Sequence, residues 1–360
     1  MKFKKQIIFF NPSIEDGGVE KNLINICNGL ASYFEIILVT ANNNKKNKFI
    51  KDVKYISPNT TFFNKKSRLI KIIVCVYLMF RNFYGKKINI FSFQSNITAI
   101  IISKILQNKI IIRANSSPNY YANNVMKKNL MSVFFSLADK IIVNSDHFKK
   151  EFQKFFKLKP IRIYNLMEKN KDLKKLYKKK VKFNFFDKEK SALKVVSIGR
   201  LVAQKDHITI LKALDLIKHK KKFVFCLIGK GDQKYNLLRF IKNKGLTGRV
   251  KLIGYKKNTY PYYKKADLFI LSSKYEGLPN TLLEALSMGV PIISSDCKTG
   301  PSEILKKKYG KLFKVGDYKA LSKFINDSKK KLKLTNVNDS RFDFENNLMK
   351  YKKVILSLNN

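Results

Sequence analysis

Two glutamates, Glu276 and Glu284, stand on either side of a predicted helix start that follows an apolar run. Pro279 lies between them and suits a first helical turn, where its missing N–H is not needed. Glu284 falls about one and a half turns into that helix at roughly 3.6 residues per turn. Two carboxylates so placed can bind hydroxyl groups at two points of one extended ligand, while the helix start attracts an anion between them. The simpler interpretation is a helix-start preference plus one exposed glutamate, and spacing alone favours it.

Two cations, Arg200 and Lys205, follow a different apolar run in Ser197-Ile-Gly-Arg-Leu-Val-Ala-Gln-Lys-Asp206. Fixed cations suit a diphosphate, and a guanidinium can bind one in bidentate fashion. A solvated basic loop is the alternative in a chain this rich in lysine. Because ligands of parallel sheets bind beyond the carboxyl ends of the strands, the position of this loop favours a binding site.

A third candidate is the pair Gly17 and Gly18, between the first apolar run and the first predicted helix. Glycines there allow a ligand to approach the backbone closely, and the helix start provides N–H groups for an anion. A plain glycine turn explains the pair equally well. The spacing matches neither the dinucleotide fingerprint nor a phosphate-binding P-loop.

Short apolar runs alternate with helical patterns, which predicts parallel sheets with crossover helices. In the first half the predicted strands are Gln6–Asn11, Glu35–Thr40, Ile88–Phe93, Lys109–Ala114, Lys140–Ser145 and Ile161–Asn165, and the predicted helices are Lys21–Tyr33, Arg68–Tyr84, Asn96–Gln107 and Asn129–Leu137. In the second half the predicted strands are Leu193–Gly199, Phe223–Gly229, Val250–Gly254, Ala266–Ser273 and Pro291–Asp296, and the predicted helices are Gln204–Lys218, Lys234–Lys244, Pro279–Ser287 and Tyr318–Lys331.

This pattern indicates two doubly wound α/β domains, residues 1–168 and 169–341, joined by a lysine-rich connection at Met167–Lys190. Residues 342–360 are expected to form a helix that packs back on the first domain. Facing sheets would place the ligand in a cleft between the two domains.

The net charge of the chain excludes fewer classes of binding partner than the sequence motifs do. The 360 residues include 74 Lys and Arg against 25 Asp and Glu, a net charge of +49. Nucleic acid, anionic lipid and a phosphorylated ligand all fit this surplus, as does a lysine bias spread over solvated surfaces. A nucleic-acid-binding protein is the rival function, but no recognition module is visible in the sequence. The hydrophobic content of 45% argues against disorder.

The four cysteines lie far apart without a C-x-x-C pair, so they indicate neither a zinc site nor a redox motif. The apolar run Ile72–Phe80 is too short for the roughly 20 residues that span a bilayer. We therefore expect a cytoplasmic protein. The basic residues that flank this run extend the expectation to peripheral binding of anionic lipid at the cytoplasmic face of the inner membrane; a buried crossover helix is the simpler interpretation.

The combination of these motifs resembles retaining glycosyltransferases of the GT-B fold, in particular glycosyltransferase family 4 (glycosyl transferases group 1). The resemblance is carried by Glu276 and Glu284 as E-x7-E, by Ser197–Lys205 and by the glycine loop Asp16-Gly-Gly-Val-Glu20. It extends over nearly the whole chain in the expected order. The GT-B fold consists of two Rossmann-like domains that face each other across a cleft.

The resemblance implies a role for each matching residue. Glu276 would bind hydroxyls of the donor sugar, Glu284 the ribose, and Arg200 and Lys205 the diphosphate. The remaining donor-binding residues would be Gly17, Gly18, Gly254, Tyr255, Gly277, Leu278 and Asn280. Arg113 and Asn115 would line the acceptor side, where many relatives have a histidine or an acidic residue.

The implied reaction moves a hexose or N-acetylhexosamine from a nucleotide-diphosphate sugar to a glycan or lipid-linked acceptor, with retention, in the assembly of a bacterial surface polysaccharide such as lipopolysaccharide. A uridine nucleotide is expected over a guanosine nucleotide. No cofactor and no metal are expected, because the metal-binding D-x-D of the other major glycosyltransferase fold is not evident. A GT-B epimerase is the alternative on the same scaffold.

Overall fold

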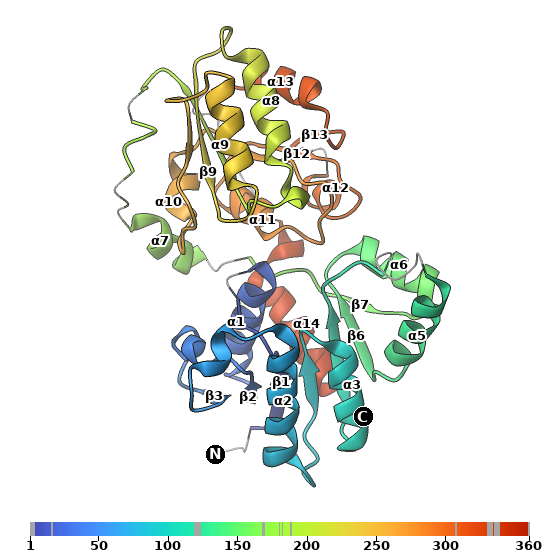
Figure 1. Cartoon of the computed structure of the whole chain (residues 1–360). Coiled ribbons are helices and arrows are strands. Elements are labelled where there is room, and N and C mark those ends of the chain that lie inside the picture. Colours follow the sequence, from blue (N-terminus) through green and yellow to red (C-terminus); the bar gives the residue numbers. More distant parts are fainter. Residues whose placement is uncertain are drawn as a thin grey trace. The chain divides into compact units, whose positions relative to one another are not determined.

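The computed structural model describes residues 4–15, 17–118, 124–167, 170–179, 181, 183–187, 189–306, 308–329, 334 and 339–358. The chain divides into two compact units. Unit 1 comprises residues up to Leu166 together with Arg341–Asn360, and unit 2 comprises Met167–Ser340. Figure 1 shows one parallel sheet with its helices in each unit.

Unit 1 has a seven-stranded parallel sheet in the order β3-β2-β1-β4-β5-β6-β7. Its strands are β1 (Gln6–Phe10), β2 (Glu35–Val39), β3 (Val53–Ile56), β4 (Ile90–Ser92), β5 (Ile110–Ala114), β6 (Lys140–Val143) and β7 (Ile161–Arg162). Its α-helices are α1 (Gly18–Leu30), α2 (Arg68–Phe83), α3 (Asn96–Ile105), α5 (Val125–Ser136), α6 (Asp146–Phe156) and α14 (Phe344–Leu356). Two short 3-10 turns, Asn43–Lys48 and Phe62–Lys65, precede β3 and α2.

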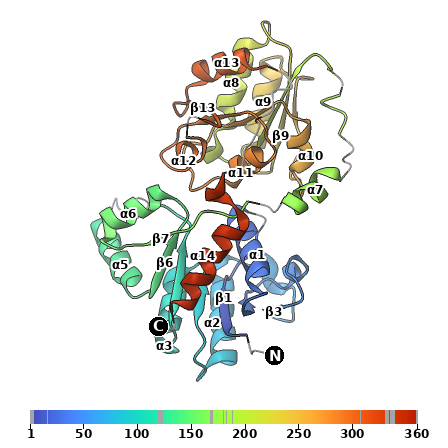
Figure 2. The ribbon, with the colours of Figure 1, turned by 180° about the vertical axis from the view of Figure 1, so that it is seen from behind.

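Alternate residues of these strands face opposite sides, and each side has its own helices. Ile7, Phe9 and Phe91 pack with α1 and α14, whereas Ile8 and Phe10 pack with α2, α3, α5 and α6. Figure 1 shows α2 and α3 side by side over one face, and Figure 2 shows α1 and α14 over the other. Nearly continuous apolar strands are thus explained by a sheet that is covered on both faces.

Helix α14 belongs to unit 1 although it follows unit 2 in the chain. Leu348, Tyr351 and Ile355 join the core on the α1 side. The two helices approach closely at Gly29, where an added Cβ would lie 2.8 Å from Leu348 Cδ1. A side chain at position 29 would therefore force the Leu348 side chain to move.

Unit 2 has a six-stranded parallel sheet in the order β10-β9-β8-β11-β12-β13. Its strands are β8 (Leu193–Ile198), β9 (Phe223–Ile228), β10 (Val250–Leu252), β11 (Leu268–Leu271), β12 (Ile292–Ser295) and β13 (Gly310–Phe313). Its α-helices are α7 (Asn170–Lys178), α8 (His207–Ile217), α9 (Lys234–Asn243), α10 (Tyr260–Lys265), α11 (Asn280–Ser287), α12 (Pro301–Leu305) and α13 (Tyr318–Asp327). Helices α8, α9 and α13 pack on one face of the sheet, where they contribute Leu211, Leu237 and Leu321 to the core.

The predicted fold class is confirmed: both units are doubly wound parallel sheets. The sequence prediction missed β3, β13, α6, α10 and α12, and the predicted connection Met167–Lys190 contains α7. The cleft predicted between the two domains stays a prediction. All four cysteines are buried and unpaired, and burial raises the pKa of the Cys226 and Cys297 thiols to about 12.

Candidate functional site

The strand order of unit 2 reverses between β8 and β11, and the loops after these two strands form the candidate site. Lys205 lies in the first loop, within the 3-10 turn Ala203–Lys205, and Glu276 lies in the second. Lys205 Nζ donates a hydrogen bond to Glu276 Oε1 and forms an ion pair with it. The two side chains are 13% and 8% exposed. A cation and a carboxylate from two separate motifs therefore meet at the switch point.

Hydrogen bonds hold the two loops together around this pair. Ser273 Oγ donates to Glu276 Oε1 at 2.6 Å. Ser272 Oγ donates to the Lys205 carbonyl at 2.9 Å. Gln204 accepts the Lys274 N–H on its carbonyl at 2.8 Å and donates from Nε2 to the Tyr275 carbonyl at 2.8 Å. The loops are fixed by their own backbone and side chains before any ligand binds.

A third loop, after β12, contacts the backbone of the loop that carries Glu276. Thr299 Oγ1 donates to the Glu276 carbonyl. Gly300 has φ +90°, and a Cβ there would lie 2.3 Å from the Gly277 carbonyl oxygen and 2.6 Å from Pro279 Cδ. Only glycine fits this close approach in a left-handed conformation, so Gly300 allows the third loop to support the second.

Glu284 projects from α11 toward α10. Its Oε2 lies 3.2 Å from the Tyr263 hydroxyl and 3.3 Å from Thr259 Oγ1, both hydrogen-bond donors. Burial, then the charge of Glu284, raises the pKa of Tyr263 well above its ordinary value. The hydroxyl therefore stays protonated and can donate to the carboxylate.

Arg200 is exposed in the same loop as Lys205, after β8. Its Nη2 donates to Gln204 Oε1 at 3.2 Å. His207 fixes the Arg200 backbone, since its Nε2 lies 3.2 Å from the Arg200 carbonyl oxygen. Burial lowers the pKa of His207 to about 4, with a smaller contribution from Lys205. The neutral imidazole thus adds no positive charge to the two cations of the site.

The other predicted donor-binding residues of unit 2 lie at the same sheet edge. Gly254, with φ +71°, and Tyr255, 42% exposed, follow β10. Lys230 Nζ lies 5.4 Å from the centroid of the Tyr255 ring. Gly277 and Leu278 lie in the Glu276 loop, and Asn280 is the first residue of α11. Unit 2 alone therefore brings together all its predicted donor-binding residues at one edge of its sheet.

Unit 1 also has a switch point, between β1 and β4. Gly17 and Gly18 are exposed at the start of α1, where Gly17 is the N-cap, whereas Asp16 of the same motif lies outside the described residues. Glu20 in the first turn is buried and accepts a hydrogen bond from Gln94 Nε2 at 2.7 Å. Burial raises the pKa of Glu20.

Arg113 is buried at the end of β5, with 1% exposure. Its guanidinium donates to the Tyr351 hydroxyl at 3.0 Å, to Asn165 Oδ1 at 2.5 Å and to Asn115 Oδ1. Asn115 also donates to the Phe93 carbonyl at 2.7 Å. These contacts hold α14 and the end of β5 together, and the predicted acceptor role of Arg113 and Asn115 stays a prediction.

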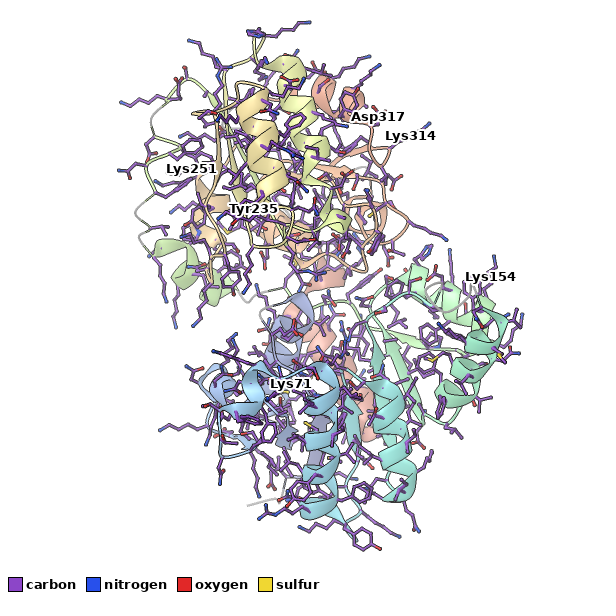
Figure 3. The ribbon with its side chains drawn as sticks, viewed as in Figure 1. Lys71, Lys154, Tyr235, Lys251, Lys314 and Asp317 are labelled. Atoms are coloured by element: carbon purple, nitrogen blue, oxygen red, sulfur yellow. The ribbon has the colours of Figure 1, made fainter. Side chains whose placement is uncertain are left out.

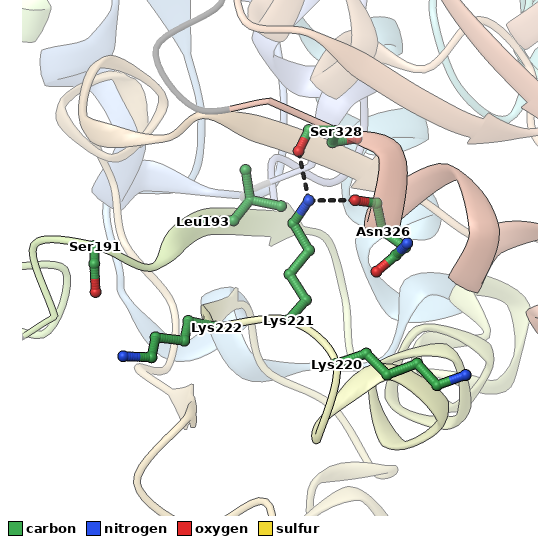
Figure 4. A pocket seen from close by; sticks show the side chains of 7 residues that line it. All are labelled: Ser191, Leu193, Lys220, Lys221, Lys222, Asn326 and Ser328. Atoms are coloured by element: carbon green, nitrogen blue, oxygen red, sulfur yellow. Dashed lines mark hydrogen bonds between the residues drawn. The ribbon is translucent and has the colours of Figure 1, made fainter.

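A separate hollow of about 340 Å³ lies at the opposite edge of the unit 2 sheet, where β8 and β9 begin (Figure 4). Its lining residues are Ser191, Leu193, Lys220, Lys221, Lys222, Asn326 and Ser328. Lys221 Nζ donates to the carbonyls of Asn326, in the last turn of α13, and Ser328, its C-cap residue, the latter at 2.6 Å. The lysine thereby satisfies carbonyls at a helix end, and the hollow is not part of the candidate site.

The sequence prediction missed Ser273, Tyr263, His207, Thr299 and Gly300. Their common signal is position: four of them stand in loops or helix starts that follow strands of unit 2, at its ligand-binding edge. Within the described part of the chain, no three His, Cys, Asp or Glu side chains cluster closely enough to hold a metal ion.

Residues 170–337 match the family model for glycosyl transferases group 1. An uncharacterized glycosyltransferase of Methanocaldococcus jannaschii is 32% identical over 223 residues, which are 59% of this chain and 55% of that protein. A second relative is a 4-alpha-N-acetylgalactosaminyltransferase of Campylobacter jejuni, named for a diphospho-undecaprenol-linked saccharide. It is 27% identical over 65% of this chain and 62% of its own length. The chain thus matches little more than half the length of these relatives.

Among solved structures, an Anabaena protein in complex with UDP and glucose superposes with a TM-score of 0.77. The match covers 98% of this chain and 99% of that one at 19% identity, so it bears on the fold alone. The predicted GT-B architecture is confirmed by this likeness and by the two parallel sheets. Neither the nucleic-acid-binding alternative nor the epimerase is favoured by these comparisons.

Proposed function

We propose that the chain is a glycosyltransferase of the group 1 family, retaining and of family 4, which transfers a hexose or N-acetylhexosamine from a nucleotide-diphosphate sugar. The observation that carries the proposal is the Lys205–Glu276 pair at the switch point of unit 2. It lies in the segment that matches the family model.

The pair is suited to exchange its partners. Without a ligand, each charge neutralises the other in a site where both are largely buried. A nucleotide-diphosphate sugar offers phosphate oxygens to Lys205 and sugar hydroxyls to Glu276, so the pair can open without leaving either charge unsatisfied. Neither a phosphate nor a sugar alone replaces both partners.

The neighbouring residues are proposed to contact other parts of the same nucleotide-sugar ligand. Arg200 is exposed next to Lys205 and can bind the diphosphate through its fork of donors. Glu284, oriented by Tyr263, binds the ribose, and the Tyr255 ring beside Lys230 meets the base. Gly277, Leu278 and Asn280 provide backbone around the diphosphate.

The two cations of the site can promote the reaction by stabilising the leaving group. Breaking the bond between the sugar carbon and the diphosphate leaves an electron-poor carbon and a departing anion. Arg200 and Lys205 stabilise the developing anion without further reorganisation, because their loops are already fixed. The reaction needs no metal in this proposal.

The acceptor is a glycan or a lipid-linked saccharide of a surface polysaccharide. The names of relatives from Erwinia amylovora and Campylobacter jejuni, an amylovoran biosynthesis glycosyltransferase and a transferase to a diphospho-undecaprenol-linked saccharide, support this class. A uridine nucleotide is the proposed donor, and the protein is proposed to act in the cytoplasm.

A thermal-shift panel of UDP, GDP, ADP and CMP tests the proposal. A nucleotide at about 100 times its Kd stabilises the folded protein by about 2.7 kcal/mol. We expect UDP to raise the Tm most and a UDP-sugar to be hydrolysed slowly without an acceptor. Stabilisation by none of the four, or an equal shift in the Lys205→Ala variant, would refute the site.

A further inference from the structure

Apolar side chains gather on the solvent side of one helical layer of unit 1. Helices α2, α3 and α5 cover the same face of the sheet. Within the described residues, this layer carries twelve of the 22 large hydrophobic side chains that are exposed: Leu69, Ile70, Ile73, Tyr77, Tyr84, Ile101, Ile105, Val125, Met126, Leu130, Val133 and Leu137. Scattered exposed apolar residues are ordinary, but a concentration over one layer marks an interaction surface.

The exposed residues form stripes at helical spacing. On α5, Met126, Leu130 and Val133 are 81%, 56% and 60% exposed, whereas Met131 and Phe135 face the core. On α2, Leu69, Ile73 and Tyr77 are 67%, 60% and 59% exposed, whereas Cys75 and Met79 are buried. Each of these helices is therefore apolar on two sides, of which packing within the unit explains only one.

Charge indicates what covers the outer side. Residues 53–138, which include all three helices, contain 13 Lys and Arg and no Asp or Glu. Exposed basic residues stand beside the stripes: Arg68 at the start of α2, Arg81 in its last turn, Lys104 on α3 and Lys127 on α5, with Lys66 and Lys128 half-buried next to them. A surface with this much positive charge and no carboxylate repels a second copy of itself.

Figure 3 shows long side chains projecting from both units, whereas Lys71, labelled there, belongs to the inner side of α2. Lys71 Nζ donates to Ser13 Oγ, in the loop after β1, at 3.3 Å. This contact fixes the inner side of α2 and leaves its apolar stripe outward. It also ties the layer to the loop that leads to Gly17 and Gly18.

We propose that the α2–α3–α5 layer is the surface by which this protein lies on an anionic lipid bilayer. Apolar side chains enter the boundary between headgroups and acyl chains while neighbouring lysines and arginines meet the anionic headgroups. Nucleic acid would satisfy the charge but not the apolar stripes. The proposal does not depend on any catalytic activity of the chain.

Flotation of the full chain with vesicles of phosphatidylcholine containing 30% phosphatidylglycerol tests the proposal. We expect binding at least tenfold tighter than to pure phosphatidylcholine vesicles and weaker in high salt. The double variant Met126→Glu/Leu130→Glu should lose at least tenfold in vesicle binding, as should Ile73→Glu/Tyr77→Glu. Because all four residues are exposed, the thermal unfolding of these variants should match that of the parent protein.

Control variants test whether the position of a charge change, and not the change itself, affects vesicle binding. Leu216→Glu/Leu238→Glu on unit 2, at residues 49% and 41% exposed, makes the same charge change away from the layer and should bind normally. Lys127→Gln/Lys128→Gln should weaken binding, whereas Lys319→Gln/Lys323→Gln on α13 should not. No binding of the parent protein, or equal losses in the layer and control variants, would overturn the proposal. A stable dimer that Met126→Glu/Leu130→Glu dissociates, with vesicle binding unchanged, would also overturn it.

Discussion

Lys205 and Arg113 are two cations held in opposite ways, one in each unit. Lys205 meets a carboxylate, Glu276, in a site that is still partly open to solvent. Arg113 is fully buried and donates to amide and hydroxyl oxygens of Asn115, Asn165 and Tyr351, with its guanidinium 5.4 Å from the centroid of the Phe93 ring. A charged pair near the surface can exchange partners when a ligand brings compensating charge, whereas a buried cation with neutral partners cannot move without losing several hydrogen bonds at once. The first arrangement suits binding, and the second suits architecture.

The largest expected effect that tests this difference is on catalysis. Glu276→Gln keeps the shape of the side chain and removes the charge that binds the sugar hydroxyls. We expect kcat for transfer to fall roughly 100-fold, because a hydrogen bond to a charged group contributes about 1.5–3 kcal/mol. Binding of the nucleotide diphosphate, measured by calorimetry, should change less than threefold.

The exposed Glu189→Gln variant is the matched control and should transfer normally. Normal turnover of Glu276→Gln would contradict the assignment of the site.

Removal of Arg113 should act on stability instead. Arg113→Met removes the hydrogen bonds from the guanidinium to Asn115, Asn165 and the Tyr351 hydroxyl, and we expect unit 1 to lose about 3 kcal/mol. Hydrogen exchange of the β5 amides measures this loss, while stabilisation by UDP should persist because the Lys205 site is in unit 2. A fully stable variant that loses transfer would reverse the contrast and place Arg113 at the acceptor.

Lys205→Ala sharpens the comparison from the other side. We expect about tenfold weaker binding of the nucleotide diphosphate, as one charge-assisted hydrogen bond is lost. Binding of the nucleoside without phosphates should be unchanged, which isothermal titration can establish. An equal loss for nucleoside and diphosphate would mean that Lys205 supports the fold of the loop rather than the phosphates.

The smallest effect is a pH dependence of unit 2. The pKa of His207 is about 4 in the folded protein, below its ordinary value of 6.5. The unfolded chain therefore takes up the proton first, and the stabilisation present above pH 6.5 is lost as the pH falls toward 4. Between pH 7.5 and 5.5 we expect a loss of about 1 kcal/mol.

His207→Gln retains an N–H for the Arg200 carbonyl and should remove this part of the pH dependence in urea unfolding. An unchanged profile in the variant would show that other groups cause the acid sensitivity.

Most strands were predictable because a sheet covered on both faces requires continuous apolar runs. The exceptions are edge strands: β3 and β13 each have one neighbour in the sheet, and each contains a lysine, Lys54 or Lys311. Helix α6 has Phe148, Phe152 and Phe156 at four-residue spacing, a signal that surrounding lysines obscured. Helix α7 is rich in lysine, so its sequence resembles a connection between domains.

The candidate site was predictable as a set of loops but not as a set of contacts. Strand order places Lys205 beside Glu276, although 70 residues separate them in the sequence. Spacing along the chain cannot show that Thr299 supports Glu276 or that Tyr263 orients Glu284, because those contacts depend on how separate loops converge. Local pattern predicts elements, and topology decides which of their ends meet.

The return of α14 to unit 1 dictates an order of events during synthesis. A ribosome adds roughly 5–20 residues per second, so residues 344–358 are made about 10–35 s after the rest of unit 1. Until then Phe91 and Arg113 lack Tyr351, and the first sheet has one face incompletely covered. Unit 2, made later, can complete its own contacts first, so the nascent N-terminal half is the part that a chaperone would have reason to shelter.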